Sequence, residues 1–168
     1  MGVGVGLPLS AFRSDAAGLT AEEFRAQHGA CFLVTQNATT PIRASKQTVL
    51  SEPVSEDASA FSFLVFPLLP RPANPFPGFL SIGRTANNDI VLDDASISKC
   101  HAFIRMSGDG VVLEDANSKN GTSVGGKPCG AVGNGQLLSP GDRVLLGSIN
   151  LTFVTDKELV VLCMQLPE

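Results

Sequence analysis

The chain has 168 residues, of which 17% are charged, and its formal net charge at pH 7 is −4. This length can bury one full core, while the acidic balance and the lack of any Lys/Arg run argue against a nucleic-acid partner. The 17 glycines and 11 prolines favour an all-β protein with many turns.

The start of the chain lacks a basic segment followed by a long apolar one, so we expect no signal peptide. The longest apolar run, residues 61–69, is too short to cross a bilayer, and no membrane partner is predicted. The cysteines are scattered without a CxxC pair, as Cys31, Cys100, Cys129 and Cys163. This pattern is typical of reduced thiols and predicts a cytoplasmic protein.

Residues 1–59 are predicted to form a small N-terminal α/β extension. A short helix is expected over 20–28, because Thr20 can cap it and Glu23 stands at the position that completes a capping box. A strand is expected over Cys31–Thr35. Residues 36–59 are polar and are expected to be an irregular connection, with one strand around 47–50. The helix and strand of this extension are expected to pack on the edge of the following domain.

Residues 60–156 are predicted to form one β domain, because short apolar runs alternate there with polar turns. Strands are expected at 61–66, 79–82, 90–92, 102–106, 111–114, 122–124, 136–138, 143–146 and 150–154. The absence of alternating βα units excludes a parallel sheet. The tail, 157–168, is expected to add one further strand over Leu159–Met164.

Five short motifs recur at fixed intervals through this domain. They are Gly83-Arg84, Asn88-Asp89-Ile90-Val91-Leu92, Ile97-Ser98-Lys99-Cys100-His101, Asp115 to Thr122, and Gly141-Asp142-Arg143-Val144. In order and spacing the set resembles the forkhead-associated (FHA) domain. The resemblance implies a two-sheet β-sandwich of about eleven strands. Its end loops would bind phosphothreonine on a partner protein in signal transduction, without catalysis or a cofactor.

Arg84 is the first candidate phosphate ligand, since a guanidinium can donate two parallel hydrogen bonds to phosphate and stays charged. Ser98 is the second, because its hydroxyl can donate to a phosphate oxygen. The resemblance implies the same roles for both residues and a polar or basic contact from Lys99. It gives Gly83 and His101 supporting roles, with His101 holding the turn by hydrogen bonds.

Two other interpretations of the second motif are disfavoured. A nucleophilic Ser98 would need an oriented base, a third orienting group and an oxyanion site, and the chain suggests none of them. Cys100 and His101 form a single neighbouring pair, which is poor spacing for a metal. We therefore expect no catalytic residue and no metal site.

The segment Ser118-Lys119-Asn120-Gly121-Thr122 carries the most specific motif. By resemblance, Asn120 hydrogen-bonds the backbone of the bound peptide and Lys119 reaches the phosphate or the peptide edge. Gly121 would supply unusual dihedral angles and Thr122 would brace the loop.

The chain departs from the family pattern in two places. It has Gly125 where the family usually has Asn, which is expected to loosen that turn. Ser96 stands where some relatives carry a basic side chain, and Asp93 and Asp94 would repel an acidic peptide. We therefore expect an apolar or neutral residue beside the phosphothreonine.

The sequence thus predicts a phosphothreonine reader whose partner is the substrate of a Ser/Thr kinase. The alternative is a scaffold module of the same fold that binds its partner independently of phosphate; an enzyme ranks third. A further hypothesis is that a phosphorylated Thr39, Thr40 or Thr48 occupies the site of its own or a neighbouring chain, although an unmodified linker is favoured.

Overall fold

The computed structural model describes residues 6–35, 63–72 and 74–165, which form twelve strands and three helices. The helices are α1 Ser10–Gly18, α2 Ala21–His28 and α3 Asp156–Gln165. The strands are β1 Leu7–Pro8, β2 Cys31–Thr35, β3 Leu64–Pro67, β4 Phe79–Gly83, β5 Ile90–Val91, β6 Ala102–Ser107, β7 Gly110–Asp115, β8 Thr122–Val124, β9 Lys127–Pro128, β10 Gln136–Leu137, β11 Arg143–Leu146 and β12 Ile149–Thr155.

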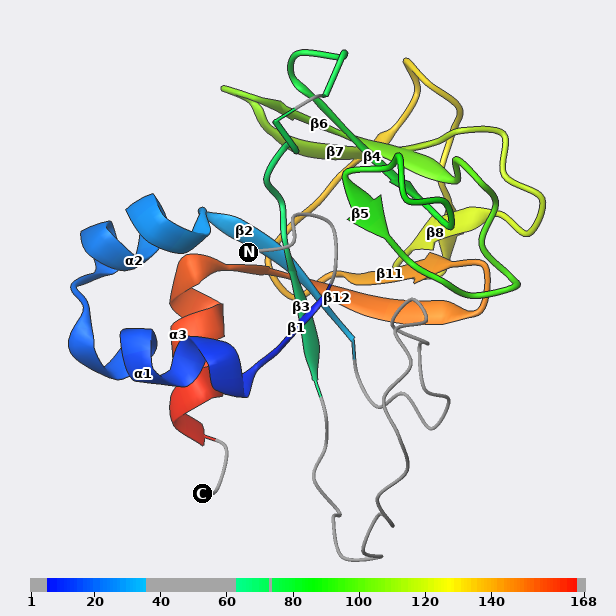
Figure 1. Ribbon diagram of the computed structural model, residues 1–168. Helices are drawn as coiled ribbons and strands as arrows, with labels where there is room; N and C mark the ends of the chain where they lie inside the picture. The colour runs from blue at the N-terminus through cyan, green and yellow to red at the C-terminus, as the bar shows by residue number, and fades with distance from the viewer. Residues whose placement is uncertain (1–5, 36–62, 73, 166–168) are drawn as a thin grey trace, which may run out of the picture.

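The strands form two sheets, which lie in separate layers of the molecule (Figure 1). The larger sheet has the order β1-β3-β2-β12-β11-β8-β9, and the smaller one β10-β7-β6-β4-β5. Neighbouring strands are antiparallel except β4 and β5, which pair in parallel. The predicted all-β sandwich is confirmed. The exclusion of a parallel sheet holds, because the parallel pair β4–β5 is a single pair of two residues at the edge of an otherwise antiparallel sheet.

The predicted strands between residues 79 and 154 are all present, within one residue of the expected limits. The two-residue strands β1 and β9 were not anticipated, because each contains a proline, a residue that argues against a strand. Within the region that the structure describes, no helix is long and apolar enough to span a membrane.

The main core fills the space between the two sheets. Leu33 and Leu151 contribute from the larger sheet, and Ile82, Ile104 and Leu113 from the smaller one; each is at most 2% exposed. This core anchors the ends of β4, β6 and β7, where the candidate binding loops begin and end.

A second core lies between the outer face of the larger sheet and the three helices (Figure 1). On β2, Phe32 and Val34 belong to this core, whereas Leu33 between them belongs to the main core. Successive side chains of a strand point to opposite faces, so a strand covered on both sides must be apolar throughout. This explains the unbroken apolar run of β2.

Strand β2 lies inside the larger sheet rather than at its edge. It pairs with β12 from Cys31↔Thr155 to Thr35↔Leu151, and on its other side with β3 from Phe32↔Pro67 to Val34↔Val65. The expectation of edge packing is therefore wrong. The composition of a short apolar run does not show whether the strand will have one neighbouring strand or two, because its neighbours come from distant parts of the sequence.

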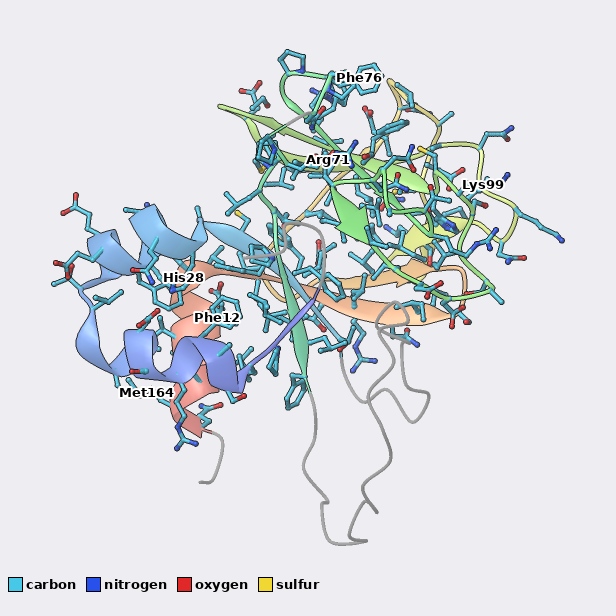
Figure 2. All side chains as sticks on the ribbon, in the orientation of Figure 1. Phe12, His28, Arg71, Phe76, Lys99 and Met164 are labelled. Carbon is cyan, nitrogen blue, oxygen red and sulfur yellow. The ribbon has the colours of Figure 1, made fainter. Side chains whose placement is uncertain are left out.

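The predicted helix over 20–28 is confirmed as α2. Thr20 caps it, with the Glu23 N–H donating to Thr20 Oγ1 at 3.3 Å and the Thr20 N–H donating to Glu23 Oε2 at 2.9 Å. The helix ends at His28, and Gly29 follows with a φ of +96°. Helix α1 was not anticipated, and it contacts α2 through Phe12 and His28, whose rings are 5.1 Å apart (Figure 2).

The predicted strand over Leu159–Met164 is wrong, because this segment is part of helix α3. Leu159 and Cys163, four residues apart, are both buried in the second core, while Val161 and Met164 are about half exposed. Spacing by four places two residues on one helical face, and that face needs the outer side of the sheet as its partner.

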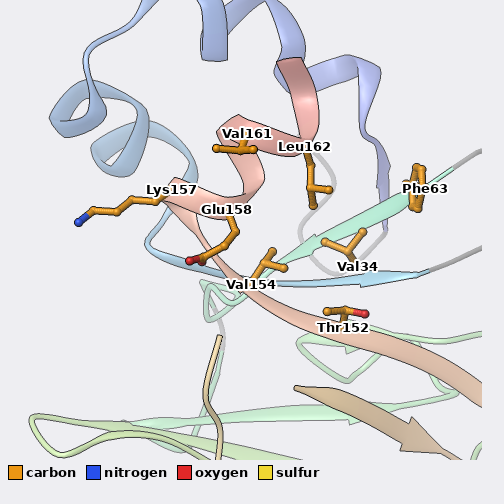
Figure 3. Close-up of a pocket in the computed structure, with 8 residues that line it drawn as sticks. All are labelled: Val34, Phe63, Thr152, Val154, Lys157, Glu158, Val161 and Leu162. Atoms are coloured by element: carbon orange, nitrogen blue, oxygen red, sulfur yellow. The ribbon is translucent and has the colours of Figure 1, made fainter. Parts of the chain in front are cut away.

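A hollow of about 430 Å³ lies between α3 and the outer face of the larger sheet (Figure 3). Its walls are mainly apolar, with contributions from Val34, Val154 and Leu162. The predicted strand around 47–50, the threonines Thr39, Thr40 and Thr48, and residues 61–62 of the predicted first strand lie outside the described residues.

Candidate functional site

Three loops meet at one end of the smaller sheet. They comprise residues 84–89, 92–101 and 116–121, called here the end loops. Strands β4 and β6 are antiparallel, as are β6 and β7. The end of β4, the start of β6 and the end of β7 must therefore lie at the same end of the smaller sheet. Topology thus brings together the three motif segments that are separated in sequence.

Arg84 begins the first end loop and is exposed. Its Nε donates to the carbonyl of Ile97 at 3.1 Å, and its backbone N–H donates to the carbonyl of Ser98 at 3.0 Å. Among the described residues, no ion pair includes this guanidinium. The two terminal amino groups can therefore donate to an external anion.

Ser98 connects the second end loop to the third. Its Oγ accepts a hydrogen bond from the Lys119 N–H at 3.0 Å. A hydroxyl has one hydrogen and two lone pairs, so this bond leaves the hydrogen available for another acceptor. Ser98 can therefore donate to an anion while it holds Lys119.

Asn120 also connects these two loops, since its Nδ2 donates to the carbonyl of Ser96 at 2.8 Å. Lys99 and Lys119 are exposed, and neither belongs to an ion pair of the described chain. The three basic side chains of this end are thus not neutralised by the ion pairs found in the protein. The five residues predicted to contact a phosphopeptide all lie on the second and third end loops or directly after β4.

Gly83 permits a close approach between the first two end loops. A Cβ at this position would lie 2.2 Å from the Lys99 carbonyl oxygen and 2.6 Å from Asn88 Nδ2. Asn88 is 3% exposed, and its Nδ2 donates to the carbonyls of Lys99 at 2.7 Å and Thr85 at 2.8 Å. Asn88 lies within one of the sequence motifs, but no role was predicted for it; in the structure it holds the loop of Arg84 against Lys99.

Asp89, the next residue, ties this loop to the start of the domain. Its carboxylate accepts from the Arg71 N–H at 2.9 Å, from Asn74 Nδ2 at 3.1 Å, and from the N–H and hydroxyl of Ser81 at 2.8 and 2.9 Å. A buried polar atom needs such partners, and Asp89 is 3% exposed. Its role is structural and was also missed, because these partners are distant in sequence.

His101 is fully buried between the second and third end loops. Its Nδ1 accepts from the Ser98 N–H at 3.0 Å, so Nε2 carries the hydrogen and donates to the Gly121 carbonyl at 3.0 Å. Both ring nitrogens are therefore engaged by backbone groups. This arrangement leaves neither nitrogen free to take a proton from the Ser98 hydroxyl, which argues against a Ser–His catalytic pair.

Asp115 organises the third end loop at its start. Its carboxylate accepts from the Ser118 N–H at 3.0 Å, and from the hydroxyls of Ser118 and Thr122 at 2.6 Å each. Burial raises the pKa of Asp115, but these hydrogen bonds outweigh burial and hold the pKa below its ordinary value. Gly121 has a φ of +83°, which permits the turn before Thr122.

Cys100 is exposed on the second end loop, but partial desolvation by the surrounding chain raises the pKa of its thiol. A raised pKa lowers the thiolate fraction and hence the reactivity of the side chain. No group of three potential metal-binding side chains occurs within the described ranges. The end loops offer hydrogen-bond donors and the positive charges of Arg84, Lys99 and Lys119.

Comparison with known proteins gives an independent view of this region. The family model described as FHA domain matches residues 80–147. An oxoglutarate dehydrogenase inhibitor from Corynebacterium jeikeium is 39% identical over 72 residues, covering 43% of this chain and 47% of that protein. Glycogen accumulation regulator GarA from Mycolicibacterium smegmatis is 37% identical over 75 residues, covering 45% of each chain.

The matched segment thus spans about half the length of these relatives. Among solved structures, the FHA domain of the CT664 protein from Chlamydia trachomatis is 27% identical with a TM-score of 0.48, covering 74% of this chain and 96% of that one. The family match contains all three end loops and lies inside the predicted domain of residues 60–156, whose outer limits stay a prediction. Residues 80–147 of this chain therefore form an FHA domain.

Proposed function

We propose that the chain binds phosphothreonine on a partner protein through Arg84, Ser98, Lys99, Lys119 and Asn120. The observation that carries this proposal is that two donors lie on adjoining loops: the Arg84 guanidinium, which forms no ion pair among the described residues, and the Ser98 hydroxyl, whose hydrogen is available. Both groups are held by hydrogen bonds within the chain, from Arg84 to Ile97 and from Lys119 to Ser98. The membership of residues 80–147 in the FHA family supports the same ligand.

A phosphate ester carries a charge of about −2 at neutral pH and several strong acceptor oxygens. Each hydrogen bond to such a group contributes on the order of 1.5–3 kcal/mol. An unphosphorylated threonine lacks these acceptors, so binding should depend on phosphorylation. Asn120 would bind the peptide backbone and set its direction, and Gly83, His101, Gly121 and Thr122 would support the loops.

The proposal is recognition without catalysis or a cofactor. The partner would be the substrate of a Ser/Thr kinase, with no nucleic acid and no membrane surface involved. The two relatives described above are named for inhibition and regulation, which supports a regulatory role through binding. A cytoplasmic location remains part of the proposal and rests on the free state of the four cysteines.

The test is binding of the whole chain to a degenerate library of phosphothreonine peptides, followed by affinity measurement with selected peptides. Arg84→Ala should weaken binding by about tenfold or more, because it removes a charge-assisted donor pair. Arg84→Lys should lose part of this affinity, since an ammonium keeps the charge but lacks the planar fork. Calorimetry or fluorescence anisotropy gives the dissociation constants.

Arg143→Ala serves as the matched control, because Arg143 is an exposed arginine on β11. It should bind as the wild-type chain does. If no library peptide binds, or if unphosphorylated peptides bind equally well, the phosphate-independent scaffold module is the correct interpretation.

A further inference from the structure

We propose that Ser96 and Ser148 are positioning residues that fix the Asn120 carboxamide for reading the peptide backbone; this inference rests on the proposed function. Ser148 lies in the turn between β11 and β12, one residue beyond the segment that matches the family. This turn adds a fourth segment to the three end loops.

The Ser96 hydroxyl uses its complete hydrogen-bonding capacity. It donates its hydrogen to Asp94 Oδ1 at 2.6 Å. Its oxygen accepts from the N–H of Ser148 at 3.0 Å and from the Ser148 hydroxyl at 2.8 Å. One hydrogen and two lone pairs are all that a hydroxyl offers, so this side chain has a single favoured orientation.

The backbone of Ser96 is held equally firmly. Its N–H donates to Asp94 Oδ1 at 2.8 Å. Gly147, which has a φ of +55°, packs so closely that a Cβ there would lie 2.5 Å from the Ser96 carbonyl oxygen. The Gly147 N–H in turn donates to the Gly121 carbonyl at 3.0 Å. The β11–β12 turn therefore contacts the second and third end loops, which carry Ser98 and Asn120.

The fixed position of Ser96 also fixes Asn120, because Asn120 Nδ2 donates to the Ser96 carbonyl at 2.8 Å. This bond uses one amide hydrogen and fixes the plane of the carboxamide. The second hydrogen and Oδ1 remain available to a peptide carbonyl and a peptide N–H. A donor and an acceptor that are already oriented lose less entropy on binding than a freely rotating side chain.

The test compares a phosphothreonine peptide with capped phosphothreonine, which has no neighbouring residues. Ser96→Ala should weaken peptide binding about two- to tenfold, the range expected when one neutral hydrogen bond between Asn120 and the peptide backbone is weakened or lost. Binding of capped phosphothreonine, followed by NMR titration, should stay unchanged, because the phosphate contacts involve Arg84 and Ser98. A purely structural defect would weaken both ligands alike.

Ser148 is exposed, and Ser148→Ala removes only the hydroxyl group that donates to Ser96. This variant should also weaken peptide binding, and it keeps the inference testable if Ser96→Ala fails to fold. Ser107→Ala is the matched control, since Ser107 is exposed at the far end of β6. In the Asn120→Ala background, Ser96→Ala should have no additional effect, because the two residues act as one unit.

The inference is overturned if Ser96→Ala and Ser148→Ala both bind the peptide as the wild-type chain does. It is also overturned if the Ser96→Ala loss adds fully to that of Asn120→Ala, or if capped phosphothreonine is weakened equally. In each of these cases phosphate-dependent binding by the wild-type chain survives, so the proposed function stands. Loss of phosphate dependence in the wild-type chain would instead remove both proposals.

Discussion

At the scale of single residues, a few polar side chains hold the end loops in place. His101 joins the Ser98 N–H to the Gly121 carbonyl, and Asn88 joins the first end loop to the Lys99 carbonyl. Because these bonds are made within the chain, they pre-organise the loops and reduce the entropy lost on binding. The proposed ligand-binding residues therefore depend on neighbours that would not touch the ligand themselves.

Asp115 is expected to make stability sensitive to acid. Hydrogen bonds from Ser118 and Thr122 lower its pKa in the folded chain relative to the unfolded chain, where an aspartate has a pKa of about 3.9. The stabilisation is therefore present above that pH and is lost as the pH falls through the lower, folded-state value. The free energy of unfolding, measured by urea titration at several pH values, should decline below about pH 4.

Asp115→Asn separates this contribution from that of other carboxylates. The variant should be less stable at neutral pH and should show a shallower decline in acid. Asp109→Asn is the control, because Asp109 is exposed in the turn between β6 and β7. Equal acid dependence in the wild-type chain and Asp115→Asn would contradict the assignment.

At the scale of elements, turn chemistry explains where the short strands pair. Strands β8 and β9 are joined by Gly125 and Gly126, which have φ values of +57° and +81°. Two successive positive φ angles define the two-residue turn whose twist matches that of antiparallel strands. The turn has the geometry that an Asn-Gly pair would adopt. The effect of glycine in place of asparagine is therefore on the unfolded chain, which has more conformational freedom to lose on folding.

Gly125→Asn should stabilise the protein by a few tenths to about 1 kcal/mol, because it reduces the freedom of the unfolded chain. Asparagine tolerates a positive φ, and a Cβ at Gly125 would meet no atom within 4 Å. Thermal unfolding followed by circular dichroism measures the change. Gly125→Val, which strains the same backbone position, should destabilise, and a lower melting temperature for Gly125→Asn would refute the argument.

At the scale of the whole molecule, the larger sheet separates two cores. One face packs on the smaller sheet, and the other packs on the helices α1, α2 and α3. Arg25 on α2 and Asp156 at the start of α3 add an ion pair with a 3.0 Å separation, and Asp156 is 3% exposed. The segments before and after the FHA segment thus complete its larger sheet and cover the outer face of that sheet.

This arrangement predicts that a fragment beginning at residue 60 is strongly destabilised. The fragment lacks β2, which pairs with both β12 and β3, and it exposes the apolar residues that β2, α1 and α2 cover. Circular dichroism should show no cooperative thermal transition, in contrast to the fragment 6–165. A cooperative transition at an unchanged temperature would show instead that residues 60–168 fold without the preceding region.

The sequence alone predicted most of the strands, because alternating apolar runs and glycine-rich turns are local signals. It also predicted helix α2 through the capping box of Thr20 and Glu23, since that motif spans only four residues. The motif set around Arg84, Ser98 and Asn120 pointed to the FHA family, and the family match agrees. The strand and helix predictions succeeded because their determining interactions lie within a few residues of one another, and the family prediction succeeded because the order and spacing of the motifs can be read from the sequence.

Only the tertiary structure decided how distant segments combine. It placed β2 inside the larger sheet and showed that Leu159–Met164 belongs to a helix. It also brought Ser96 into hydrogen-bond contact with Ser148, which lies 52 residues away in the sequence. A buried apolar run has no intrinsic preference for one packing partner. A serine likewise has no preferred hydrogen-bond partner until the fold brings donors and acceptors near it. Such outcomes depend on which surfaces the fold brings together, because burial and hydrogen bonding are satisfied by position in space rather than in sequence.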